Sequence, residues 1–198
     1  DISLGLSDRA LMDFSDVVFG RCSLEKAAVG HPDLPGLSLL TAPMSFTPQL
    51  TQWQVQELLD AARKRYDYIM IDSPAGLGPG FQLASCGADR ALVVSTNDAS
   101  SLRDAQRTVA ELDRLEQIHL VMNRIQPKLL RQLRTTIDDA MDAAGLPLLG
   151  IVPEDPQVML CANQGQPLIL RASRGAAVAY LNIAKRLLGQ KAPLMKMR

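Results

Sequence analysis

Short apolar runs alternate with segments of helical period along almost the whole chain. Five runs have the length of a buried strand, at residues 36–43, 66–72, 90–96, 117–123 and 146–153. Each is apolar nearly throughout rather than at alternate positions, which is typical of strands covered on both faces of a parallel sheet. Such strands, separated by helices, predict a doubly wound α/β domain with a mostly parallel sheet.

Helical period predicts the elements between these strands. The segment 47–66 begins with Thr-Pro and places four apolar residues on one face, Val55, Leu58, Leu59 and Ala62. The segment 97–115 begins with two N-cap residues and repeats apolar residues at helical spacing, at Leu102, Ala105, Val109 and Leu112. A further helix is expected at 173–189, and two short ones within 7–20 and 23–29.

Composition narrows the classes of function. The 198 residues carry 21 basic and 21 acidic side chains, so the chain as a whole is not attracted to nucleic acid, and no such partner is expected. Its three cysteines lie far apart, which argues against a disulfide framework or a zinc site and favours a reducing cytosol. The length fits a single domain spanning residues 1–198.

The run 66–72 ends in Asp72, and a turn rich in glycine follows. Gly76, Gly78 and Gly80 do not form the G-x-G-x-x-G fingerprint of a dinucleotide site, because Phe81 stands where its third glycine belongs. A lone Asp after an apolar strand is also the Walker B arrangement, in which the carboxylate orients Mg²⁺ beside nucleotide phosphates. The strand pattern alone leaves this reading and that of a capping Asp before an ordinary turn both open.

Two further strands end in polar residues. Asn123 and Arg124 follow one of them, where an Asn amide can read a purine edge and an Arg can stack on it. The next strand is followed by Pro153, Glu154 and Asp155, in a loop that proline makes rigid and that can form one wall of a base pocket. Ligands of doubly wound folds gather at the carboxyl ends of the strands. Three polar clusters at three strand ends therefore favour a nucleotide site.

Several segments resemble the MinD family of septum-site-determining ATPases. They are, in order, YDYIMIDSPAG, LVMNRIQP, PLLGIVPEDPQV, NQGQPLIL and AYLNIAKRLLG. The resemblance covers essentially the whole chain and implies the P-loop NTPase fold of the MinD/ParA type. DSPAG is its most discriminating piece, because ParA-like relatives usually carry a Pro-Pro pair there. SSLRDAQR resembles the start of the family's SSVRD helix.

The resemblance implies a role for each matching residue. Asp72 matches the Walker B Asp, which holds Mg²⁺ through water, and a switch loop follows it at Ser73, Pro74, Ala75 and Gly76. The segments that contact adenine match Asn123, Arg124, Pro153, Glu154 and Asp155. Partner proteins would dock on the helix that carries Arg103 and Asp104, although Gln106 stands where some relatives have an acidic residue.

The resemblance also implies ligands and partners. An intact enzyme would bind ATP and Mg²⁺, form an ATP-dependent homodimer, and work in the cytoplasm and on the inner face of the cell membrane. It would recruit a MinC-like division inhibitor and be controlled by a MinE- or DivIVA-linked topological regulator. An amphipathic helix after the LLG segment would bind anionic lipid.

One expected motif is not found in these residues. The deviant Walker A loop, K-G-G-x-G-K-[ST], occurs nowhere in the 198 residues, so we expect this chain to lack the P-loop strand and not to hydrolyse ATP alone. The membrane helix is likewise expected beyond the residues given. Two other functions stay open, a ParA-type or flagellar-number-regulating ATPase and a non-catalytic partner-binding fragment.

Overall fold

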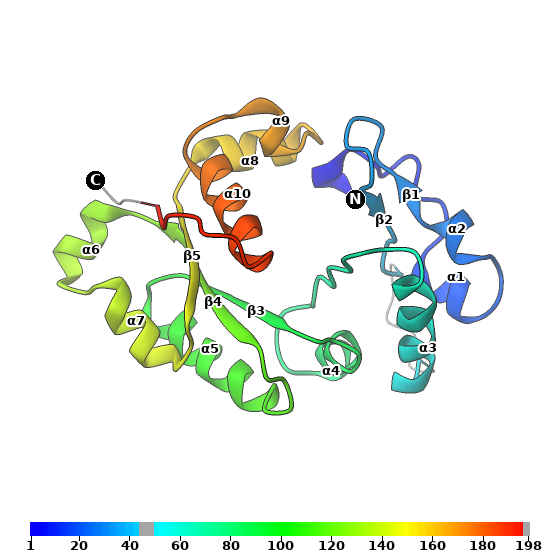
Figure 1. Ribbon diagram of the computed structural model, residues 1–198, viewed down its shortest axis with the longest axis horizontal. Helices are drawn as coiled ribbons and strands as arrows, with labels where there is room; N and C mark the ends of the chain where they lie inside the picture. The colour runs from blue at the N-terminus through cyan, green and yellow to red at the C-terminus, as the bar shows by residue number, and fades with distance from the viewer. Residues whose placement is uncertain (44–49, 196–198) are drawn as a thin grey trace. The chain divides into compact units, whose positions relative to one another are not determined.

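The computed structural model describes residues 1–43 and 50–195 of the chain. They form two compact units, one of Asp1–Ala88 with Ala162–Pro167 and one of Asp89–Cys161 with Leu168–Arg198 (Figure 1). The following paragraphs describe each unit by itself. The first holds the segment around Asp72, and the second holds the parallel sheet.

The first unit contains helices joined by irregular segments and one two-stranded sheet. Its helices are η1 (Ile2–Leu4), α1 (Phe14–Val18), α2 (Leu24–Ala27), α3 (Gln52–Arg63) and α4 (Pro79–Ser85). Helix α3 confirms the expected apolar face, with Leu59 and Ala62 buried. It begins after Thr51, whose hydroxyl and Gln54 form a capping box. The Thr-Pro start expected at 47–48 lies outside the described residues.

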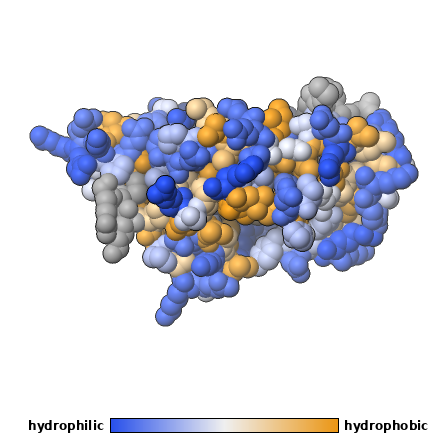
Figure 2. Space-filling view, turned by 90° about the horizontal axis from the view of Figure 1, so that it is seen from above, coloured by the Kyte–Doolittle hydropathy of each residue, from blue (hydrophilic) through white to orange (hydrophobic). Residues whose placement is uncertain are grey.

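Of two strand predictions in this unit, one is confirmed only in part and the other is wrong. The run 36–43 forms the short strand β2 (Ser38–Leu39), but it pairs antiparallel with β1 (Val29–Gly30) and is not buried; Thr41 adds a single bridge to Asp13. The run 66–72 forms no strand, and Tyr68 and Met70 are 65% and 75% exposed. An extended segment has no hydrogen bonds of its own, so it becomes a strand only where another backbone lies beside it. Figure 2 shows apolar residues among hydrophilic ones on one face of the surface.

The second unit confirms three of the predicted strands. They are β3 (Ala91–Ser95), β4 (Ile118–Ile125) and β5 (Leu148–Pro153), which form a parallel sheet in that order. The connecting helices are α5 (Ala99–Glu111), α6 (Pro127–Leu133) and α7 (Ile137–Ala144). After the sheet come α8 (Pro156–Asn163), whose last two residues belong to the first unit, α9 (Leu168–Arg171) and α10 (Ala176–Leu187).

Helices cover both faces of this sheet, as the apolar strands predicted. Helices α5 and α7 pack together on one face, against β3 and β4, and α10 packs against β5 on the other (Figure 1). The core between α10 and the sheet consists of buried aliphatic residues from both, Val121, Leu149, Val152, Ala176, Ala179 and Ile183. Gly150 lets the helix approach closely, because a Cβ there would lie 2.2 Å from Cγ1 of Ile183.

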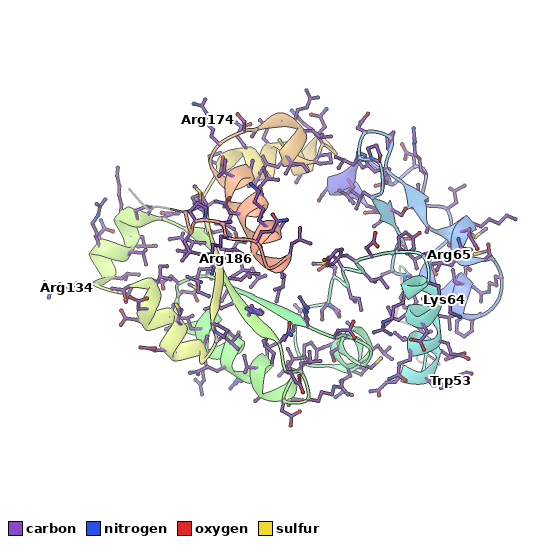
Figure 3. All side chains as sticks on the ribbon, viewed as in Figure 1. Trp53, Lys64, Arg65, Arg134, Arg174 and Arg186 are labelled. Atoms are coloured by element: carbon purple, nitrogen blue, oxygen red, sulfur yellow. The ribbon has the colours of Figure 1, made fainter. Side chains whose placement is uncertain are left out.

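Arg186 joins the end of α10 to its surroundings. Its guanidinium donates hydrogen bonds to the carbonyl of Leu148 at 3.2 Å and to that of Ala192 at 3.3 Å. It therefore lies against the start of β5, whereas Arg134 and Arg174 point away from the sheet (Figure 3). The contact holds the chain after α10 against this unit.

Candidate functional site

Asn123 and Arg124 lie in a bulge of β4 rather than after its end. The pairing runs from Met122 opposite Ile151 to Ile125 opposite Pro153, so the two residues face only Val152 on β5. Arg124 has a φ of 54°, which non-glycine residues seldom adopt, and its N–H donates to the Asn123 side chain at 3.0 Å. Bulges of this kind commonly redirect side chains next to functional sites.

The loop after β5 returns to this bulge. Arg124 Nε donates to Glu154 Oε2 at 2.9 Å, and the Glu154 N–H donates to the Ile125 carbonyl at 3.0 Å. The sequence placed these residues on two separate strand ends, and the structure brings them together. The ion pair is exposed, with 68% of the Arg124 side chain accessible, so it orders the loop more than it stabilises the fold.

Asp155 is held by backbone groups. Its Oδ1 accepts the Gln157 N–H and its Oδ2 accepts the Ala176 N–H, each at 3.0 Å. Those amides belong to the first turns of α8 and α10, whose unpaired N–H groups favour a negative charge. Burial, together with the charge of Asp155, raises the pKa of the Tyr180 hydroxyl on α10.

The segment from Asp72 to Gly76 lies in the other unit. Asp72 is exposed, and α4 begins after Gly78 without any side-chain cap, so Asp72 does not cap it. The Ser73 hydroxyl donates to the Pro74 carbonyl at 3.3 Å, and Gly76 has a φ of 85°. A Cβ on Gly80 would lie 2.8 Å from Pro74, so the turn folds back onto the first residues of α4.

Arg103 and Asp104 lie on the exposed side of α5. Asp104 faces Arg107 one turn later, with 3.7 Å between the charged atoms. Gln106 donates from its side chain to the carbonyl of Ala143 at the end of α7. This residue thus connects two helices, while the two charged positions before it stay accessible.

One residue that shapes the site carries no signal in the sequence. Gly175 precedes α10 with φ 61° and ψ −133°, and a Cβ there would lie 2.3 Å from Oδ2 of Asp155. The sequence shows a glycine before a segment of helical period. It does not show that Gly175 lies close to Asp155, which is 20 positions away.

Two kinds of feature are not found among the described residues. In residues 1–43 and 50–195 there is no cluster of three or more His, Cys, Asp or Glu side chains that could hold a metal ion. A single exposed carboxylate such as Asp72 suits an ion that keeps most of its water. Within the same ranges, no helix has both the length and the apolar character that a bilayer span requires.

Comparisons with known proteins identify relatives. The chain is 36% identical over 200 residues to the septum site-determining protein MinD of Bacillus subtilis, and the match covers 98% of this chain and 75% of the relative. In the MinC:MinD cell division protein complex of Aquifex aeolicus, a chain 32% identical superposes with a TM-score of 0.91, covering 99% of this chain and 81% of that one.

A more distant structure has the same fold. MinD of Pyrococcus horikoshii, described as complexed with Mg-ADP, is 24% identical with a TM-score of 0.81, covering 94% of this chain and 76% of that one. No protein-family model matches the chain.

Proposed function

Since this chain belongs to the MinD family of septum site-determining proteins, we propose that it is the nucleotide-responsive part of a MinD-like ATPase. In the intact enzyme, bound Mg-ATP would drive dimerisation and attachment to the inner membrane face. The dimer would recruit a MinC-like division inhibitor, and hydrolysis would release it into the cytoplasm.

The contact between Arg124 and Glu154 is the observation that carries this proposal. It joins the bulge of β4 to the loop after β5 at the carboxyl edge of a parallel sheet. Doubly wound folds bind nucleotides at this edge. The relative from Pyrococcus horikoshii, which is described with Mg-ADP, supports a nucleotide and Mg²⁺ as the ligands.

Each part of the site would have one task. Asn123, Arg124, Pro153 and Glu154 would bind and orient the base, and Asp155 would belong to the same loop. Asp72 would hold Mg²⁺ through water, and Ser73 to Gly76 would form the switch loop. ATP would supply the phosphoryl bond whose cleavage resets the dimer.

Partners would bind elsewhere on the chain. Arg103 and Asp104 are exposed on α5, where the MinC-like inhibitor and a MinE- or DivIVA-linked regulator would dock. A basic amphipathic helix after α10 would attach the dimer to anionic lipid. Two weak helices in one dimer bind far more strongly than one, so ATP would control membrane residence.

The exposed segment 66–72 is relevant to whether the two units form a single domain in the intact protein. Its apolar residues suit a buried strand, yet no described strand pairs with it. We propose that it pairs with a strand that carries the deviant Walker A loop, which these 198 residues do not contain. The two units would then belong to a single nucleotide-binding domain, and the 198 residues alone would not hydrolyse ATP.

Calorimetry with Mg-ATP tests the proposal on the 198-residue chain and on the full product of its gene. We expect binding by the full product only, and a loss of that binding in Asn123→Ala. Asn182→Ala serves as the control, because the Asn182 side chain donates to the Pro193 carbonyl after α10 and not to the loop after β5. If the full product does not bind Mg-ATP, the ATPase proposal is wrong and the partner-binding fragment takes its place.

A further inference from the structure

We propose that Asp155 is a positioning residue, whose carboxylate fixes the loop after β5 to the first turns of α8 and α10 and thereby sets nucleotide affinity without contacting the nucleotide. The inference rests on the proposed function and refines it. It changes the role expected for Asp155 from a base contact to a support for Glu154 and Arg124.

The two carboxylate oxygens of Asp155 accept hydrogen bonds from different helices. Oδ1 accepts from Gln157, two residues away, whereas Oδ2 accepts from Ala176, which is 21 residues away. Hydrogen bonds to an ionised carboxylate are roughly twice as strong as neutral ones. One side chain therefore ties the loop to two helices, of which α10 packs on the sheet through Ile183.

Gly175 leaves room for this carboxylate. A Cβ at residue 175 would come within 2.3 Å of Oδ2, closer than two unbonded atoms can approach. The backbone of Gly175 also has a φ of 61°, a conformation that side chains disfavour. A side chain at this position would displace Asp155 from the start of α10.

The loop transmits the position of Asp155 to the bulge. Its neighbour Glu154 bonds to β4 twice, through its N–H to Ile125 and through its carboxylate to Arg124. A loop released from α10 would lose the fixed direction of both contacts. The Arg124 side chain, which is largely exposed, would then be free to leave the base.

The test uses the full product of the gene with Asp155→Ala and Asp155→Asn. The matched control is Asp139→Ala, because Asp139 also accepts two hydrogen bonds at a helix start, from the N–H and hydroxyl of Thr136 at 2.7 and 2.9 Å. Calorimetry measures affinity for Mg-ATP and for inorganic tripolyphosphate, which lacks the base. Hydrogen exchange measures protection of the Ala176 amide.

We expect Asp155→Ala to weaken Mg-ATP binding by on the order of tenfold, to leave tripolyphosphate binding unchanged, and to lose protection at Ala176. Asp155→Asn keeps one carbonyl acceptor and the same shape, so its loss should be smaller. Asp139→Ala should change neither affinity, although it removes a helix cap of similar kind.

Three results would overturn the inference. Unchanged Mg-ATP affinity in both Asp155 variants would show that the loop needs no support. Equal losses for Mg-ATP and tripolyphosphate would show a general loss of structure instead. Retained protection of Ala176 would show that the bond to Oδ2 is dispensable. If the unsubstituted protein binds neither ligand, the proposed function itself falls, which is a separate outcome.

Discussion

At the scale of single residues, two glycines with positive φ differ in what surrounds them. Gly145 ends α7 with φ 67° and has open space around its Cβ position, whereas a Cβ on Gly175 would meet Asp155. We predict that Gly145→Ala lowers the free energy of unfolding by about 1 kcal/mol, from backbone strain alone. Gly175→Ala should lower it by more than twice as much. Urea denaturation of both variants gives the comparison, and equal losses would contradict the packing around Asp155.

A second residue-scale feature is the cap of α5. Asp98 accepts hydrogen bonds from the Thr96 hydroxyl at 2.5 Å and from the Ser101 N–H at 2.9 Å. These bonds, that of Thr96 foremost, hold the pKa of the Asp98 carboxyl well below its ordinary value of 3.8. A folded pKa below the unfolded one stabilises the fold at pH values above the ordinary value. This contribution is lost as the pH falls through the folded pKa.

We therefore predict that Asp98→Ala lowers the free energy of unfolding by about 1 kcal/mol at neutral pH. The difference from the unsubstituted chain should narrow as the pH falls below the ordinary pKa of 3.8. Chemical denaturation over a pH series measures it. Asp142→Ala, which removes an exposed carboxylate from α7, is the control and should leave the free energy of unfolding nearly unchanged at neutral pH. A constant difference at every pH would contradict the role of the charge.

At the scale of elements, α10 and β5 depend on each other through one close approach. We predict that Gly150→Ala destabilises the chain by about 2 kcal/mol, because its methyl group would overlap Ile183. Ile183→Ala alone should also destabilise it, by leaving a cavity. In the double variant the new methyl group has room, so the summed loss should be less than additive. Urea denaturation of the four proteins completes the cycle, and strict additivity would mean that the two positions do not touch.

At the scale of the whole molecule, the exposed segment 66–72 has opposite consequences in two contexts. Met70 is 75% exposed in the 198-residue chain, where apolar surface of this kind promotes association. We predict that Met70→Lys reduces the aggregation of this chain, measured by light scattering. In the full product of the gene, where we propose that the segment is a buried strand, the same change should lower the thermal midpoint. A change without effect there would mean that the segment stays exposed.

The sequence alone determined most of the second unit. The runs at 90–96, 117–123 and 146–153 became β3, β4 and β5, and the periods around Asp98 and Ala176 became α5 and α10. These strands pair with one another, so each apolar strand has a hydrogen-bonded neighbour within the described residues. Parallel strands end at the same edge of a sheet, so the sequence could place the ends of β4 and β5 at one edge, whereas the contact of Arg124 with Glu154 is a finding of the structure.

Tertiary structure alone decided the rest. The sequence marks 66–72 as apolar, but it cannot supply the neighbouring backbone that would make the segment a strand. Similarly, the bond from Ala176 to Asp155 and the approach of Gly150 to Ile183 join residues whose separation along the chain carries no signal. Periodicity reports which side of an element is apolar, because that depends on nearby residues. Hydrogen bonds between distant elements depend on where the folded chain places them.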